Sequence, residues 1–431
     1  SGDHDTAMEL ASRIMEFDPG SSIGYHLMAE ICQDRSDYEA AIKFVGEGLN
    51  HNPSSKLLLH KAFNLQAFHG NNLSAIECGK RCLELFEEDP DIEPRLIHIV
   101  QTCCEWEFFA KLSQKIIRNV EHQVGNNQRI ATSPNNLQGT SLPYEFLVKA
   151  GKNASDQIIR KMEPYRRHTS FNTNPNRYAT NSRIRIGYLV PYTTFHSMPL
   201  QLLKLVELHD RSKFEIFGYS IMAPDHTNFS KVFVESFDQF RWSESTVELA
   251  TKIHEDNINI LVDNSGHTES NCLDVCALKP AAVSIHYMGY TMSLGAEFMD
   301  YVISDPDLIT SDQKDAGPEK LIYLCETIFP ASGLAANDFV PTRKELGLPE
   351  DAFVFCNFNQ PFKIEPEIFS TWIDILKAVP DSVLWLGDWN DLANDKLLEF
   401  ATKEGLDGNR IIFGEIARHG LHLARLSRAD L

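Results

Sequence analysis

The sequence lacks the features of a membrane or secreted protein. It contains no run of eighteen apolar residues, so no segment is predicted to span a bilayer. Its first residues, SGDHDTAMEL, show neither the basic start nor the apolar stretch of a signal peptide, although Ser1 is not an initiator methionine and this evidence is weak. The nine cysteines form no CxxC pair and lie mostly in apolar runs, which favours reduced core cysteines. We therefore expect a cytoplasmic protein without a membrane partner.

Basic residues are also scarce. The chain has 40 Lys and Arg against 60 Asp and Glu, which gives a formal net charge of −20. Such a surface repels phosphate backbones, so we expect no nucleic acid partner, and an anionic small ligand would need a local cationic pocket. With 431 residues, of which 43% are hydrophobic, the chain is predicted to be globular and to contain two or three domains.

Apolar positions in the first third of the chain recur every 34 residues. Three sets share this period: Ala7, Ala41 and Ala75; Met15, Leu49 and Leu83; and Pro19 and Pro53. Small alanines allow antiparallel helices to approach closely, and a proline ends the second helix of each pair. The pattern predicts tetratricopeptide repeats and capping helices over residues 1–115. A groove of this kind usually holds an extended peptide or another protein, and a homodimer could form through the same repeats.

The rest of the chain has a different pattern of apolar residues. Residues 116–182 are predicted to form a helical linker with polar connectors. From residue 183, short continuous apolar runs alternate with helical patterns, which indicates parallel sheets covered on both faces. Two such series, 183–330 and 331–431, predict two Rossmann-like lobes with a ligand at the carboxyl ends of the strands between them.

The second lobe is predicted to be incomplete. Only three strands precede a fourth that begins at residues 429–431. We therefore expect a truncated fragment that has little or no catalytic activity by itself.

The most specific stretch is ELGLPEDAFVFCNFNQPFKIEP, residues 345–366. A strand runs into Asn357–Gln360, and Lys363 follows at the start of a helix, whose N-terminus favours anions. By itself, a lysine in this position is more often a solvated surface charge. Together with DSVLWLGDWN, GNRIIFGEIARHGLHLARLSRADL, ALKPAAVSIHYMGYTMSLGAEFMDYVISD and the repeats, however, it closely resembles the O-GlcNAc transferase and SPINDLY family. The resemblance covers essentially the whole chain in the same order.

The resemblance implies a fold and a nucleotide-sugar site. The fold class would be α plus α/β, with the repeats leading into a GT-B type pair of lobes. Lys363 would stabilise the departing diphosphate as a catalytic group, since a desolvated cation lowers the barrier to charge development. The other nucleotide-sugar contacts implied for the C-terminal lobe are Gln360, the backbone of Ala417, His419, His422 and Arg425. Without the resemblance, His422 and Arg425 would be assigned to an exposed helix face.

The N-terminal lobe would supply the acceptor side. His196 lies beyond the first strand, and a neutral imidazole there could take the proton of the acceptor hydroxyl. Asp263 is a second candidate base, and the phosphate of the donor is a third. The sugar or acceptor pocket implied by the resemblance contains His267, Thr268, Gly289 and Tyr290.

No metal or cofactor is expected beyond the UDP-sugar substrate. Asp305 and Asp307 have the DxD spacing of metal-dependent transferases, but aspartates are favoured in turns in any case. Inverting enzymes of the resembled type use lysine and helix dipoles in place of a metal.

The implied function is inverting transfer of N-acetylglucosamine from UDP-GlcNAc to Ser or Thr hydroxyls of proteins. Alternatives are O-fucosyl transfer from GDP-fucose, glucosyl transfer to Asn, and a repeat scaffold with an inactive transferase half. The last alternative is motivated by Thr291 and Asp388, which depart from the residues that relatives usually carry near the donor.

Overall fold

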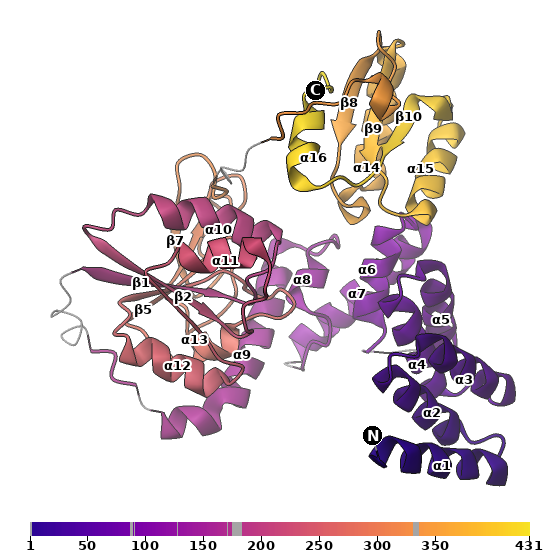
Figure 1. Cartoon of the computed structure of the whole chain (residues 1–431), viewed down its shortest axis with the longest axis horizontal. Coiled ribbons are helices and arrows are strands. Elements are labelled where there is room, and N and C mark those ends of the chain that lie inside the picture. Colours follow the sequence, from indigo (N-terminus) through magenta and orange to yellow (C-terminus); the bar gives the residue numbers. More distant parts are fainter. Residues whose placement is uncertain are drawn as a thin grey trace. The chain divides into compact units, whose positions relative to one another are not determined.

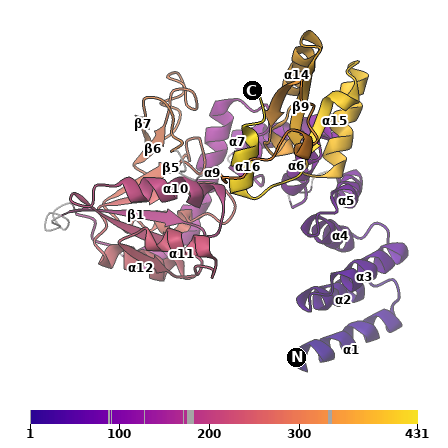
Figure 2. The same ribbon diagram turned by 45° about the horizontal axis from the view of Figure 1, so that its top comes forward.

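The computed structural model describes residues 2–86, 89, 91–126, 128–169, 171–174, 183–330 and 336–431. The chain forms two compact units (Figures 1 and 2). One contains Ser1–Ile116 together with Ala335–Leu431, and the other contains Ile117–Leu334. The predicted division at residues 115, 182 and 330 into four regions stays a prediction. No helix among the described residues is long and apolar enough to cross a membrane.

The helices at the start of the chain keep the 34-residue period. They are α1 (Gly2–Phe17), α2 (Ser22–Asp34), α3 (Tyr38–His51), α4 (Lys56–Phe68) and α5 (Asn72–Leu85). Ala41 and Ala75 are fully buried, as expected for positions of close helix approach. A Cβ added to Gly48 would lie only 2.7 Å from the Leu58 side chain, so α3 and α4 also pack closely. The predicted helical repeat is confirmed.

Two further helices join the repeats to the C-terminal part of the chain. They are α6 (Glu93–Thr102) and α7 (Trp106–Gly125). The indole Nε1 of Trp106 donates a hydrogen bond to the carbonyl of Ile364 at 3.1 Å, and its ring packs edge-on against Phe400. Asn390 donates to the Thr102 carbonyl at 3.1 Å. These contacts explain why the repeats and the C-terminal residues belong to one compact unit (Figure 1).

The C-terminal part of this unit has a three-stranded parallel sheet with the order β10-β9-β8. Its elements are η2 (Lys344–Leu346), β8 (Phe353–Asn357), η3 (Pro361–Lys363), α14 (Pro366–Ala378), β9 (Ser382–Gly387), α15 (Asp391–Lys403), η4 (Gly408–Arg410), β10 (Ile411–Gly414) and α16 (His419–Leu426). Along β8, the backbone of Cys356 donates to the Leu431 carbonyl at 2.8 Å, and Asp430 donates to Val354 at 2.8 Å. Residues 430–431 therefore hydrogen-bond along the edge of β8, where the sequence predicts the beginning of a strand.

The other unit has a seven-stranded parallel sheet with the order β3-β2-β1-β4-β5-β6-β7. The strands are β1 (Ile184–Val190), β2 (Phe214–Ser220), β3 (Gln239–Trp242), β4 (Ile260–Asp263), β5 (Val283–Tyr287), β6 (Tyr301–Ser304) and β7 (Lys320–Tyr323). Its helices are α8 (Pro134–Leu137), α9 (Tyr144–His168), α10 (Ser197–Leu208), α11 (Asn228–Glu235), α12 (Thr246–Glu255) and α13 (Leu273–Ala277).

The strand order of this sheet places a topological switch point at β1. Strands β2 and β3 follow on one side of β1, and β4 to β7 follow on the other. In doubly wound sheets, ligands bind at the carboxyl ends of the strands that flank such a point. The segments after β1 and β4 are therefore where side chains of this unit would meet a ligand.

Candidate functional site

His196 follows β1 and caps the N-terminus of α10. Its side chain accepts from the backbone N–H of Met198, and its Nδ1 lies 3.2 Å from the hydroxyl of Tyr192. The imidazole is exposed, and partial burial lowers its pKa. The ring is therefore neutral at physiological pH and open to solvent, which are the two properties a general base needs.

Asp263 ends β4 and has very different surroundings. Its carboxylate is completely buried and accepts hydrogen bonds from Ser265 N–H, Ser265 Oγ, Gly266 N–H and His286 Nδ1. Burial opposes its charge, but the hydrogen bond and charge of His286 outweigh that effect, so the pKa of Asp263 is lowered. A buried carboxylate that already accepts four hydrogen bonds is poorly suited to take a proton from a substrate. The geometry favours a supporting role for Asp263.

The four residues predicted for the sugar or acceptor pocket lie in one packed cluster after β4 and β5. His267 is 6% exposed, its Nε2 lies 2.9 Å from the Leu294 carbonyl, and burial lowers its pKa to about 4. Tyr290 is 2% exposed and packs edge-on against the His267 ring at 5.5 Å. A Cβ on Gly289 would lie 1.9 Å from the Asn264 carbonyl, so only glycine fits there. Most of these side chains shape the loops, while Thr268 is partly exposed.

A cavity of about 640 Å³ opens beside this cluster. Its wall combines residues 129–134, the helix α9 and residues 267–274. Arg129 and Glu269 are exposed on this wall, and Lys161 forms an ion pair with Asp274. The cavity is thus polar and carries charges of both signs.

Lys363 closes the short η3 helix after β8. Its side chain is exposed, and its Nζ lies 5.9 Å from the Phe362 ring centroid. No ion pair joins this ammonium to a carboxylate of the described residues. Gln360, also exposed, precedes it by three residues, and α14 begins at Pro366. The structure therefore places an uncompensated cation and a helix N-terminus at the carboxyl end of β8, an arrangement that attracts anions.

The remaining residues predicted for nucleotide contact lie in and before α16. Arg425 is 4% exposed, and its guanidinium lies 4.4 Å from the Phe358 ring centroid and 5.4 Å from that of Trp385. It donates to His422 Nδ1 at 3.2 and 3.3 Å and to the Glu415 carbonyl. Arg425 is therefore placed to support His422.

His422 is consequently held in one neutral tautomer. Burial, followed by the charge of Arg425, lowers its pKa, so the ring is neutral. Because Nδ1 accepts from Arg425, the proton of the neutral ring lies on Nε2. His419 begins α16 and is partly buried, and Ala417 lies in the segment just before it.

Sequence reasoning did not single out three residues that hold these clusters together. Phe358 and Trp385 flank the Arg425 guanidinium, and His286 bonds to Asp263. The sequence feature that could have pointed to these three residues is an aromatic residue or a histidine at the end of a predicted strand. That signal does not reveal which buried charge the ring contacts.

Two groups of acidic side chains have oxygen atoms of the kind that metal ions bind. The carboxylate of Asp305 accepts from the backbone N–H groups of Asp307, Leu308 and Ile328 at 3.0–3.1 Å. This aspartate organises the turn after β6, as the turn interpretation of its DxD spacing predicts.

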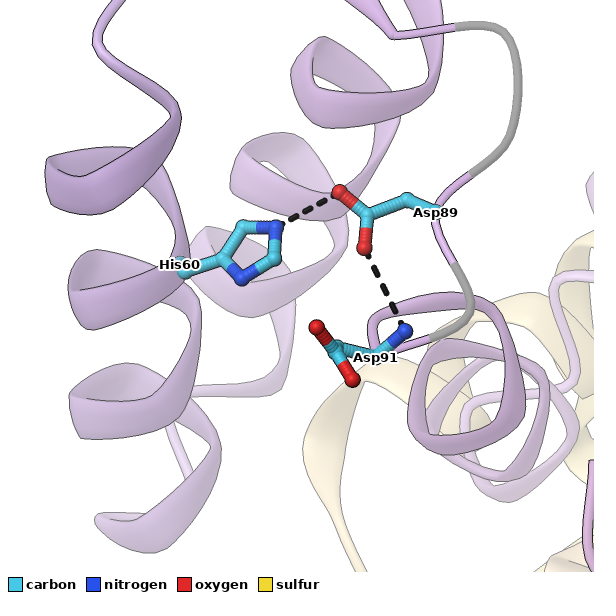
Figure 3. A group of neighbouring side chains, drawn as sticks. All are labelled: His60, Asp89 and Asp91. Carbon is cyan, nitrogen blue, oxygen red and sulfur yellow. Dashed lines mark hydrogen bonds and ion pairs between the residues drawn. The ribbon is translucent and has the colours of Figure 1, made fainter. Parts of the chain in front are cut away.

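The second group, His60, Asp89 and Asp91, lies in the repeats, where possible ligand atoms come within 4.8 Å of one another (Figure 3). His60 Nε2 lies 2.6 Å from an oxygen of Asp89, and Lys56 Nζ lies 3.4 Å from the same oxygen. The other oxygen of Asp89 accepts from the Asp91 backbone N–H, and the Asp91 carboxylate takes no part in the interactions drawn (Figure 3). A lysine already balances the buried carboxylate, so the group is suited to holding the turn before α6.

Comparison with known proteins identifies the family. A model of "Glycosyl transferase family 41" matches residues 103–334 and 330–431. The chain belongs to glycosyl transferase family 41. The resemblance seen in the sequence is thereby confirmed.

Curated relatives of this family-41 chain carry transferase names. It is 28% identical over 358 residues to "Probable UDP-N-acetylglucosamine--peptide N-acetylglucosaminyltransferase SEC" of Arabidopsis thaliana, covering 78% of the chain and 36% of that protein. It is 24% identical over 448 residues to "UDP-N-acetylglucosamine--peptide N-acetylglucosaminyltransferase" of Caenorhabditis elegans, covering 77% and 39%. The chain thus spans little more than a third of either relative.

A solved structure supports the fold. An O-GlcNAc transferase mutant from Thermobaculum terrenum matches the family-41 chain with a TM-score of 0.68 and 21% identity, over 94% of this chain and 76% of that one. This likeness confirms the predicted fold class, helical repeats followed by Rossmann-like lobes of the GT-B type.

Proposed function

We propose that this chain carries catalytic elements of an inverting glycosyltransferase that moves N-acetylglucosamine from UDP-GlcNAc to Ser or Thr hydroxyls of proteins. The observation that carries this proposal is the exposed Lys363 at the carboxyl end of β8, which forms no ion pair with a carboxylate of the described residues, in a chain of a glycosyltransferase family. The names of the Arabidopsis and Caenorhabditis relatives support the donor and the acceptor class.

The proposed reaction needs one base and one cation. The acceptor hydroxyl oxygen attacks the anomeric carbon of the sugar, and the bond from that carbon to the diphosphate oxygen breaks. The hydroxyl proton passes to the neutral imidazole of His196, and UDP leaves as an anion. Lys363 and the N-terminus of α14 stabilise the charge that develops on the diphosphate, so the reaction requires no metal.

Nucleotide recognition is assigned to α16 and the segment before it. His422 offers a neutral ring whose orientation is fixed by Arg425, and it is placed to stack on the nucleoside. The Ala417 backbone, His419 and Gln360 complete the proposed contacts with the base, ribose and diphosphate. In this assignment Arg425 acts through His422, because its own guanidinium is buried against the rings of Phe358 and Trp385.

On the acceptor side, we assign the loop residues Thr268 and Gly289, shaped by His267 and Tyr290, to the sugar. The groove of the helical repeats is proposed to hold the polypeptide acceptor, as arrays of this type usually do. The reaction is placed in the cytoplasm, where cysteines such as Cys272 and Cys276 stay reduced.

Nucleotide selectivity tests the proposal directly. Thermal unfolding of the chain is measured with UDP, GDP or no nucleotide, because a ligand that binds only the folded state raises Tm. We expect UDP to raise Tm and GDP to leave it unchanged. A larger shift with GDP would favour fucosyl transfer, and no shift with UDP would contradict the proposal.

A further inference from the structure

His286 is a buried histidine that the proposed reaction does not use. It lies near the end of β5, directly opposite Asp263 in the register of the neighbouring parallel strand β4. Its ring is completely buried. Nδ1 lies 2.8 Å from an oxygen of Asp263, and Nε2 lies 2.6 Å from the backbone carbonyl of Tyr290.

These two contacts identify the protonation state of the His286 ring. A backbone carbonyl can only accept, so Nε2 carries a proton. The Asp263 carboxylate already accepts from Ser265 and Gly266, which favours its ionised form and makes it an acceptor for Nδ1 as well. Both ring nitrogens therefore donate, and His286 is an imidazolium paired with a buried carboxylate.

The pair joins two loops, one of which contains a strained residue. Met288, a non-glycine residue, has a φ of 83°, a conformation that costs energy and persists only when its surroundings enforce it. Next to it, Gly289 packs against the Asn264 carbonyl, and Asn264 Nδ2 donates to the Tyr287 carbonyl at 3.0 Å. The segments 264–268 and 287–290 thus hold each other. His286 bonds directly to Tyr290 in the second segment, and it reaches the first through Asp263, which accepts from Ser265 and Gly266.

We propose that His286 is a positioning residue that, as a buried imidazolium, fixes the loops 264–268 and 287–290 in the geometry needed on the sugar and acceptor side. This inference rests on the proposed function for its catalytic consequence. Its structural core, a charged histidine that locks two loops, stands on the contacts alone.

The proton on His286 depends on every charged group around it. Burial lowers its affinity for the proton, while Asp263 and the Tyr290 carbonyl raise it, and the pKa of His286 is raised overall. Glu319, which accepts from Ser293 Oγ and the Ala296 N–H, adds to this attraction. His267 is neutral, and burial raises the pKa values of the Cys272 and Cys276 thiols, so these neighbours carry no charge. The lock should therefore loosen only as the pH rises above the ordinary histidine range.

Two measurements test the lock without any catalysis. The ring nitrogens of His286 are observed by NMR in the unaltered chain, where we expect both to be protonated at pH 7. Amide hydrogen exchange is then compared between the chain and His286→Gln. We expect faster exchange in 264–268 and 287–290 and unchanged exchange in the repeats.

A matched control comes from the same unit. His209 is half-buried and bonds to the Tyr188 hydroxyl at 2.8 Å instead of to a residue of either loop, so His209→Gln should leave the exchange of both loops unchanged. A single protonated nitrogen on His286 at pH 7 would overturn the inference. Equal exchange in both loops of a folded His286→Gln chain would do so as well.

Kinetics distinguishes this inference from the proposed function. In the whole enzyme, His286→Gln should lower kcat by about tenfold to a hundredfold, as expected for misplaced reacting groups, and leave UDP affinity unchanged. The loss should be present across the pH range of the assay, whereas in the unaltered enzyme the loss that comes from loosened loops should appear only at alkaline pH. If the enzyme transfers no sugar at all, the proposed function fails, while the NMR and exchange results still decide the role of His286.

Discussion

The two units of this chain carry charged groups in opposite settings. Lys363, in the unit that contains the repeats and the three-stranded sheet, is exposed and makes no ion pair with a described carboxylate. Asp263 and His286, in the unit of the seven-stranded sheet, are completely buried and bonded to each other. All three lie at or just beyond carboxyl ends of parallel strands.

The difference indicates two uses of charge at a strand end. An exposed cation without a partner retains its capacity to bind an anion, and it gains little stability for the fold. The two charges of a buried pair have lost their water and contact each other, so neither is available to bind a ligand. Removing one partner leaves the other charge buried and unpaired, which strongly destabilises the fold.

The largest effect is expected from Asp263→Ala. It leaves the His286 imidazolium buried without its counter-charge, which should lower the free energy of unfolding by about 3–5 kcal/mol. Urea denaturation of the chain measures this loss. Asp307→Ala, at an exposed turn position, is the matched control and should change stability little. Similar stability of the two variants would show that Asp263 and His286 form no buried ion pair.

Removing the exposed cation should affect chemistry and spare the fold. Lys363→Met is expected to lower the rate of sugar transfer by about 10²–10³-fold, the range seen when one group that stabilises developing charge is lost. The rate is measured in the whole enzyme with labelled UDP-GlcNAc and lysate proteins, alongside the unfolding midpoint. Lys377→Met, in the last turn of α14, provides the control. Equal rates for both variants would remove Lys363 from the reaction.

A smaller effect is expected in nucleotide binding from Arg425→Met. The substitution keeps an unbranched side chain against Phe358 and Trp385 but removes the donors to His422 Nδ1. UDP affinity should fall by about tenfold, the equivalent of one hydrogen bond to a charged group. Isothermal titration with UDP measures the change. A folded variant that binds UDP as tightly as the unaltered chain would show that Arg425 does not position His422.

The smallest effect concerns pH. Because the pKa of His286 is raised in the folded state, its contribution to stability is fully present below about 6.5, the ordinary pKa of histidine, and is lost as pH rises through the folded value. The difference in unfolding free energy between the unaltered chain and His286→Gln should therefore shrink as pH increases. His196 should behave differently: its lowered pKa keeps the ring neutral, so the acid limb of kcat/KM should lie below 6.5. A stability difference that grows with pH would contradict the ion pair.

The sequence was sufficient for the architecture because periodic patterns report burial directly. The 34-residue spacing of Ala41 and Ala75 reappears as fully buried positions in α3 and α5, the corresponding helices of neighbouring repeats. The continuous apolar runs from residue 183 onward correspond to strands of parallel sheets, and the fold class is confirmed. The sequence also placed Lys363 beyond a strand and before a helix, since the strand and the helix are each visible as a local pattern of apolar residues.

The roles of individual charges could not be obtained in this way. Asp263 and His196 were both candidate bases in the sequence, because each follows a predicted strand. Their accessibility differs, and that of Asp263 depends on the four donors around it, one of which, His286, lies 23 residues further along the chain. Likewise, the position of Arg425 on α16 depends on Phe358, which follows β8, and on Trp385, which lies in β9.

The sequence by itself determined the order of helices and strands, the repeat and the family, since these follow from local periodicity and contiguous motifs. The tertiary structure alone decided which charges face solvent and which are locked in pairs. The physical reason is that solvation and hydrogen bonding depend on neighbours from distant parts of the chain, so the ionisation and reach of Asp263, His286 and Arg425 are settled only when the strands pair.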